Sequence, residues 1–95
     1  MNACYILFSE KLLKFYIGST HDDVESRLQS HISHKYGNHR FTAKASDWKI
    51  YLVIPTENYA KAVRIERKIK SMKSSKYIRQ LKEDIKLLET LIQST

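Results

Sequence analysis

The strongest strand pattern in the sequence lies at residues 48–54, Trp-Lys-Ile-Tyr-Leu-Val-Ile, and the only proline of the chain, Pro55, closes it. Two shorter runs, residues 5–8 and 15–17, are also rich in the aromatic and β-branched residues that favour strands. Only residues 9–14 separate these two runs, so we predict that they pair as a hairpin. The three runs together predict one small sheet.

Apolar residues at helical spacing predict three helices around this sheet. Residues 24, 28 and 32 are apolar and recur every four positions, which predicts a first helix. A second helix is predicted from about residue 57 to 72 and a third from about 75 to 93. The inner face of the second is expected to carry Ala62, Ile65, Ile69 and Met72. Residues 34–47 are polar without a sustained period and predict a loop. The fold class is therefore α/β or α+β around one sheet.

The length predicts a single domain over residues 1–95, because one core is normal for a chain of 95 residues. Cys4 is the only cysteine and cannot form an internal disulfide, which favours a reducing compartment. No apolar stretch approaches the roughly 18 residues that span a bilayer. We therefore expect a soluble, cytoplasmic protein without a membrane partner.

The charge of the chain points to a polyanionic partner. Seventeen Lys and Arg residues against ten Asp and Glu residues give a net charge of +7. Between residues 61 and 79, eight basic residues accompany a single acid, Glu66. Nucleic acid fits this segment better than a membrane does, because the segment lacks a broad apolar face rich in Trp or Phe. The alternative is an ordinary solvated basic helix.

The last predicted helix has two interpretations. Its apolar residues at 78, 81, 85, 88 and 92 are spaced alternately by three and four, with Ile at position a and Leu at position d of a heptad. That choice favours a two-stranded parallel coiled coil and hence a homodimer through the C-terminal helix. However, Leu87 and Leu91 widen the seam into the face of a helix that packs on its own domain.

An ordered set of residues resembles a known nuclease family. Tyr5 is followed eleven residues later by Tyr16-Ile17-Gly18. Arg27 then precedes His31 by four residues, and Glu66 stands alone on the basic helix. From about residue 4 to 81 this order resembles the GIY-YIG endonuclease domain, especially its small standalone members. The segment Phe41-Thr42-Ala43-Lys44 and Trp48 resemble that subgroup as well. The first motif departs from the family, since it reads Ala3-Cys4-Tyr5 in place of Gly-Ile-Tyr.

The resemblance implies a fold and an activity. The fold would be a three-stranded, mainly antiparallel sheet with an N-terminal hairpin, flanked by helices and followed by a C-terminal helix. The activity would be metal-dependent hydrolysis of DNA phosphodiester bonds, with Mg²⁺ or Mn²⁺ and no other small-molecule cofactor. Recognition of a branch, flap or distorted duplex in repair or recombination is compatible with so small a domain. The altered first motif favours an alternative, a nucleic-acid-binding module on the same fold with weak cleavage.

The resemblance also assigns roles to individual residues. Glu66 would hold the metal ion, although an ordinary helical pair with Lys70 is the alternative. Tyr5 is the candidate general base, and Tyr16 is a second phenol beside it. A free phenol has a pKa near ~10, so its phenolate would need stabilisation. Arg27 would bind the scissile phosphate through its planar fork, unless it pairs with an acid of the preceding turn.

The remaining assignments concern the surroundings of the cut. His31 would hydrogen-bond the phosphate or a tyrosine, and Gly18 would allow close approach of backbone or DNA. Lys44 and Lys70 would contact phosphates away from the cut. We expect Tyr5, Tyr16, Arg27 and Glu66 to converge on one pocket. A zinc site is not expected, because the histidines at 31, 34 and 39 are irregularly spaced and no paired cysteine accompanies them.

Overall fold

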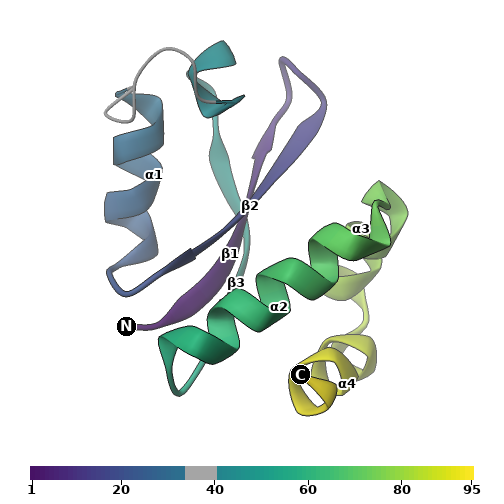
Figure 1. Cartoon of the computed structure of the whole chain (residues 1–95). Coiled ribbons are helices and arrows are strands. Elements are labelled where there is room, and N and C mark those ends of the chain that lie inside the picture. Colours follow the sequence, from purple (N-terminus) through teal and green to yellow (C-terminus); the bar gives the residue numbers. More distant parts are fainter. Residues whose placement is uncertain (34–40) are drawn as a thin grey trace.

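The protein is a three-stranded sheet with helices on both faces, in a computed structural model that describes residues 1–33 and 41–95 (Figure 1). Its elements, in chain order, are β1 (Ala3–Ser9), β2 (Lys14–Thr20), α1 (Val24–Ile32), the short 3₁₀ helix η1 (Phe41–Lys44), β3 (Lys49–Pro55), α2 (Tyr59–Met72), α3 (Ser75–Glu83) and α4 (Ile85–Ser94). The strand order is β2-β1-β3 and both pairings are antiparallel. The predicted fold class and N-terminal hairpin are therefore confirmed. The predicted loop contains η1, and its residues 34–40 lie outside the described part of the chain.

The hairpin turn between β1 and β2 forms without a glycine. Leu13 takes the left-handed conformation there, with φ of 54°, and its side chain is exposed. Asp47, from the segment before β3, stabilises the turn. Its carboxylate accepts hydrogen bonds from Ser9 Oγ at 2.6 Å and from the Lys11 backbone N–H at 2.9 Å. These bonds, the one from Ser9 above all, lower the pKa of Asp47. A single acid from the segment before β3 thus binds both the end of β1 and the turn that follows it.

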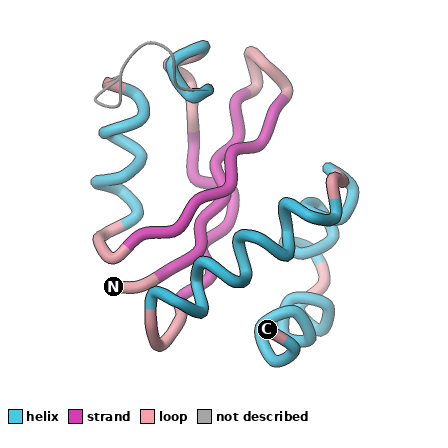
Figure 2. Tube along the Cα trace, in the orientation of Figure 1, coloured by secondary structure: helices cyan, strands magenta, loops and turns pink. Residues whose placement is uncertain are grey.

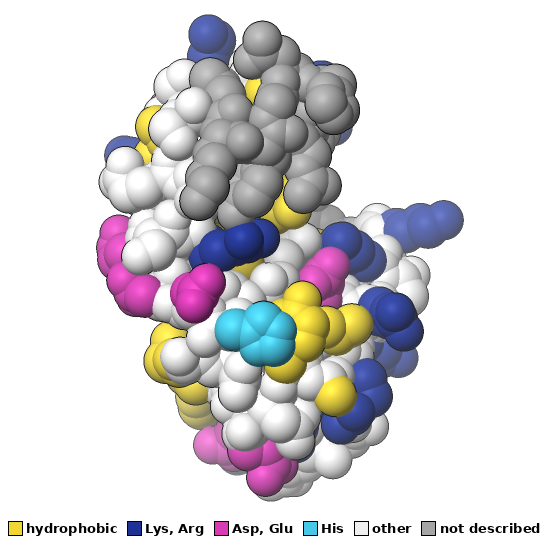
Figure 3. Space-filling model, turned by 60° about the vertical axis from the view of Figure 1, so that its left-hand side comes forward, with side chains coloured by type: hydrophobic (Ala, Val, Ile, Leu, Met, Phe, Trp, Pro, Cys, Tyr) yellow, Lys and Arg dark blue, Asp and Glu magenta, His cyan; other side chains and the backbone are white. Residues whose placement is uncertain are grey.

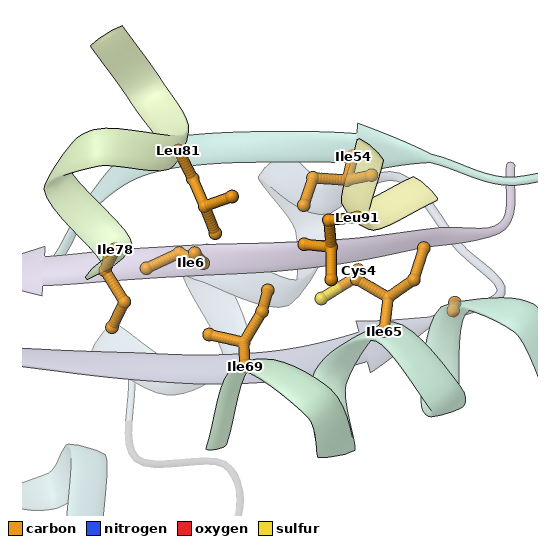
Figure 4. Packing of buried hydrophobic residues seen from close by; sticks show 9 residues of the cluster. Cys4, Ile6, Ile54, Ile65, Ile69, Ile78, Leu81 and Leu91 are labelled. Carbon is orange, nitrogen blue, oxygen red and sulfur yellow. The ribbon is translucent and has the colours of Figure 1, made fainter. Parts of the chain in front are cut away.

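The central strand β1 sends alternate side chains into two separate cores. Cys4 and Ile6 face α2, α3 and α4, whereas Tyr5 and Leu7 face α1 and Trp48. Figure 2 shows the strands lying between α1 on one side and α2 on the other. In Figure 4, Ile65 and Ile69 of α2 point toward the first of these cores. Because the side-chain period of a strand is two, the helices on each face contact only every second residue of β1.

Helix α2 has a defined start and an unusual end. Its N-cap is Asn58, whose side chain accepts a hydrogen bond from the Lys61 N–H at 2.8 Å. Its C-cap is Lys73, which is left-handed with φ of 48° although it is not glycine. The predicted inner face is confirmed at Ala62, Ile65 and Ile69. It is wrong for Met72, which is 43 % exposed because it is the last residue of α2, where the helix ends.

The single C-terminal helix predicted for residues 75–93 is wrong, because the chain forms two helices there. Asp84 is extended between α3 and α4, and its carboxylate caps α4 by accepting hydrogen bonds from two backbone N–H groups. The heptad seam is therefore interrupted, and Ile85 within it is 63 % exposed. Leu81 and Leu91 are buried in the domain's own core, as the packing interpretation predicts. Dimerisation through this region stays a prediction. No helix in the described ranges combines the length and apolar composition needed to cross a bilayer.

We expect Cys4 to resist alkylation in the folded protein. Burial raises the pKa of its thiol to about 12, and the nearby Glu66 carboxylate acts in the same direction. At pH 8 the thiolate is then scarce, so iodoacetamide should react about 1,000-fold more slowly than with an ordinary exposed thiol. Mass spectrometry after timed alkylation, with and without urea, measures this. Fast labelling without urea would contradict the burial of Cys4.

Candidate active site

Three polar side chains form a buried chain of hydrogen bonds on the α1 face of the sheet. The Tyr5 hydroxyl lies 3.0 Å from His31 Nε2, and His31 Nδ1 lies 2.9 Å from Thr42 Oγ1. All three residues are buried, and Trp48 Nε1 fixes the last of them by donating to the Thr42 carbonyl at 2.8 Å. The sequence predicted a hydrogen bond from His31 to a tyrosine or the phosphate, and the structure shows the tyrosine. Thr42 had no role in the sequence-based prediction.

The hydrogen-bond chain suits either neutral tautomer of His31. A neutral imidazole donates through one nitrogen and accepts through the other. If the ring proton is on Nδ1, the imidazole donates to Thr42 Oγ1 and accepts from the Tyr5 hydroxyl at Nε2. If the proton is on Nε2, the imidazole donates to the Tyr5 oxygen and accepts from the Thr42 hydroxyl at Nδ1. In each case both ring nitrogens have a partner within the protein.

Gly18 makes room for the Tyr5 ring. The two residues are cross-strand partners in the β1–β2 pairing. A Cβ atom at position 18 would lie 2.5 Å from the Tyr5 hydroxyl and 2.6 Å from the ring carbon that bears it. Close approach at Gly18 was predicted, and in the structure the group that approaches is the protein's own phenol. Tyr16 packs beside this cluster, with its ring centre 6.3 Å from that of Tyr5 and 4.7 Å from that of His31.

Glu66 lies on the other face of the sheet. Its Oε1 accepts a hydrogen bond from Ser19 Oγ at 2.5 Å, and its Oε2 pairs with Lys70 Nζ at 2.6 Å. The helical pair with Lys70 is therefore present, as the alternative interpretation predicted. The Glu66 side chain is 20 % exposed and that of Lys70 is 53 % exposed, so the pair is open to solvent. Ser19, like Thr42, was missed by the sequence analysis, and its position directly after Tyr-Ile-Gly is the only feature that could have indicated it.

The predicted single pocket is thus replaced by two groups on either side of one strand. Tyr5, Tyr16 and His31 are brought together on the α1 face, whereas Glu66 contacts Ser19 and Lys70 on the α2 face. The groups meet at consecutive residues of β2, because Gly18 contacts Tyr5 and Ser19 binds Glu66. Since β2 is an edge strand, its outer side is not covered by another strand. A polymer lying along that outer side could reach both groups.

The predicted cationic residues lie on both the α1 side and the α2 side of the sheet. Arg27 is half-buried on α1, one turn before His31, and Lys44 is exposed at the end of η1. Lys70 is exposed on α2. Figure 3 shows further Lys and Arg side chains gathered along the flank where α2 lies. Positive charge is therefore present on each side of the sheet, and Lys70 lies closest to β2 through its pair with Glu66.

A metal ion would have one carboxylate ligand here. Over residues 1–33 and 41–95, no three His, Cys, Asp or Glu side chains gather into a site. The histidines at 34 and 39 lie outside the described residues. Glu66 Oε1 is hydrogen-bonded to the Ser19 hydroxyl, and Oε2 is bound to the ammonium group of Lys70. The second oxygen therefore already holds a cationic group. This donor set fits a mostly hydrated ion with a single protein carboxylate, a mode that Mg²⁺ accepts.

Fold and site together define a small α+β domain, with phenols, an imidazole and a carboxylate distributed around an edge strand. The chain belongs to the GIY-YIG family, because the family model of the GIY-YIG catalytic domain matches residues 1–86. The family indicates endonuclease activity in general, with DNA as the substrate. Neither a curated protein nor a solved structure gives a significant match to the chain.

Proposed function

We propose that this protein is a metal-dependent endonuclease that cuts the DNA backbone across the outer edge of β2, with selectivity for DNA structure in repair or recombination. One observation carries the proposal. Consecutive residues of the edge strand, Gly18 and Ser19, contact the Tyr5–His31 cluster on one face and Glu66 on the other. A phosphate at this edge would meet groups from both faces, so the two halves act together only on a substrate that lies along the outer side of β2.

Glu66 is the residue that would hold Mg²⁺ or Mn²⁺, with water and phosphate oxygens completing the coordination. Such an ion would supply positive charge to the phosphate and a more acidic water. Before it binds, Lys70 occupies the second carboxylate oxygen. Because both side chains of this pair are partly exposed, the ion pair is worth little and can open. Lys70 would then be released toward the DNA.

The exposure of the two tyrosines separates their roles. Tyr5 was the candidate base, but it is 0 % exposed and its hydroxyl is engaged by His31. Tyr16 is half-buried and is the phenol with access to solvent. We therefore give contact with the attacking water to Tyr16. Tyr5 and His31 are positioning residues, which hold the Tyr16 ring by packing against it. Arg27 would bind the scissile phosphate, and Lys44 would bind a phosphate beyond it on the α1 side.

Two observations favour the second candidate, a nucleic-acid-binding module with weak cleavage. Glu66 is engaged by Lys70, and Tyr5 is buried. A plasmid-nicking assay in Mg²⁺ or Mn²⁺, together with a DNA-binding measurement, separates the candidates. The nuclease proposal expects nicking that stops in EDTA. Tight binding without nicking in either metal would favour the binding module instead.

We expect Thr42→Val to destabilise the protein and to disturb His31. The substitution removes the hydroxyl that hydrogen-bonds to Nδ1, and a buried polar atom left unsatisfied costs about 1–3 kcal/mol. Urea unfolding should show this loss, and the ¹⁵N spectrum of the imidazole should show a change at Nδ1. Thr42→Ser keeps the hydroxyl and is the matched control. Equal ¹⁵N spectra for the wild type and Thr42→Val would contradict the hydrogen-bond chain.

A further inference from the structure

A pocket lies beside the proposed site, between β2 and the connection from α2 to α3. Its volume is about 290 Å³. Five apolar residues form part of its lining, namely Leu13, Phe15, Ile17, Ile69 and Ile78. Three lysines, Lys14, Lys70 and Lys73, and the hydroxyl-bearing residues Ser74 and Ser75 complete it. Among the described residues, none that lines the pocket is acidic.

The pocket lies next to Glu66 along α2. Ile17 precedes Ser19 by two residues on β2, so both side chains face α2. Lys70 pairs with Glu66 and also lines the pocket, which places the two features next to each other along α2. From Glu66 to Lys73 the rise along the helix is about 10 Å. Along a DNA duplex axis that distance corresponds to about three nucleotides of one strand.

The lining suits a ligand that has both an apolar surface and a negative charge. Lysines alone would attract any anion, but a hydrated inorganic anion gains nothing from contact with isoleucine and phenylalanine. Phe15 is held in place by Tyr51, whose ring meets it edge-on at 5.0 Å, and by the Arg79 guanidinium 5.5 Å from its ring centre. A nucleotide has a flat, largely apolar base joined to a phosphate. It therefore matches an apolar floor with cations around it.

We propose that this pocket binds an unpaired nucleotide of the DNA strand, about three positions from the bond that is cut. The inference rests on the proposed function in taking DNA as the ligand and Glu66 as the position of the cut. A paired base is stacked inside the duplex and cannot enter a pocket on a protein surface. The pocket would thus select a DNA with a single-stranded arm or an extruded nucleotide near the cut, over a fully paired duplex.

Binding in EDTA tests the pocket without any cleavage. Two fluorescent DNAs are compared by anisotropy: a paired duplex, and the same duplex extended by a three-nucleotide unpaired arm. The wild-type protein should bind the second about tenfold more tightly, as expected for one stacked or buried base. Lys73→Asn combined with Lys14→Gln should reduce this preference to about twofold or less. Asparagine is chosen because it tolerates the left-handed conformation at position 73.

The control variant is Lys86→Gln, which removes an exposed charge on α4 that does not line the pocket. It should keep the preference for the armed DNA. Deoxyadenosine monophosphate should compete with the armed DNA more strongly than the same concentration of inorganic phosphate. Equal competition by phosphate would overturn the proposal, because the pocket would then be only an anion site. So would equal affinity of the wild type for the two DNAs, or equal loss of both affinities in the double variant.

The outcomes are distinct from those for the proposed nuclease activity. Absence of nicking in Mg²⁺ or Mn²⁺ would count against cleavage. The preference for the armed DNA over the paired DNA could still be measured in EDTA. Conversely, nicking that is the same on armed and paired DNA would leave the nuclease in place and remove the pocket's role. Lys70 is left unchanged in these variants because it also pairs with Glu66.

Discussion

Replacing Glu66 with glutamine is expected to reduce nicking of plasmid DNA by at least about 1,000-fold, a typical loss for an essential catalytic group. Glutamine has nearly the same shape, and its amide oxygen can still accept the hydrogen bond from Ser19. It lacks the negative charge that a divalent ion requires, so the cation would lose its protein ligand. The measurement is the initial rate of supercoiled plasmid loss in Mg²⁺ and in Mn²⁺.

Two variants control this experiment. Glu89→Gln makes the same chemical change at an exposed position on α4 and should leave nicking unchanged. Lys70→Gln separates metal binding from the helical ion pair. If Glu66 acted only through its pair with Lys70, the two variants would lose activity equally. Nicking that persists in Glu66→Gln at the wild-type rate would mean a contaminating nuclease or another site.

The sheet and its hairpin could be predicted from the sequence because strands are signalled locally. Aromatic and β-branched runs identify each strand, and the short connection forces the first two to pair. The break at Asp84 could not be predicted in the same way. The apolar spacing continues through it as if one helix ran from α3 to α4, and Asp84 acts by capping the second helix in an extended conformation. A capping residue inside a regular apolar pattern competes with continuation of the helix. Here the packing of Leu91 in the core favours two helices over one.

The members of the site could be predicted, but not their distribution between the faces. The order of residues in a family motif says nothing about which side of a sheet each one occupies. The register of the β1–β2 pairing shows the side of each residue, since it pairs Gly18 with Tyr5 and Ser19 with Cys4. Adjacent strand residues point to opposite faces, so a motif that spans Gly18 and Ser19 divides its contacts between α1 and α2. The roles of Ser19 and Thr42 depend on contacts 47 and 11 residues away in the chain.

The arrangement across the edge strand restricts what the site can do. A small ligand bound on one face would meet either the phenols or the carboxylate. An extended backbone along the outer side of β2 can meet both, and the basic flanks on each side attract it. Any substitution that alters how β2 packs on β1 should therefore affect the two halves together. Gly18 is the position where a substitution in β2 should affect both halves of the site most strongly.

Gly18→Ala is expected to destabilise the fold by about 1–3 kcal/mol, the usual cost of overpacking a buried site, and to reduce nicking strongly. The added methyl would lie 2.5 Å from the Tyr5 hydroxyl, so the ring has to move. Movement of the ring breaks its hydrogen bond to His31 and shifts the surface on which Tyr16 packs. Urea unfolding measures the stability, and the nicking rate at a temperature where the variant is folded measures the activity.

A double-mutant cycle with Tyr5→Leu shows whether the clash is the cause. Removing only the hydroxyl would not suffice, because the ring carbon that bears it would still lie 2.6 Å from the new methyl. Leucine removes the whole clashing end of the ring. Gly18→Ala should therefore cost less stability in the Tyr5→Leu background than in the wild type, with a coupling of about 1 kcal/mol or more. Additive losses would mean that the effect of Gly18→Ala arises elsewhere in β2 and that Gly18 does not serve to seat the phenol.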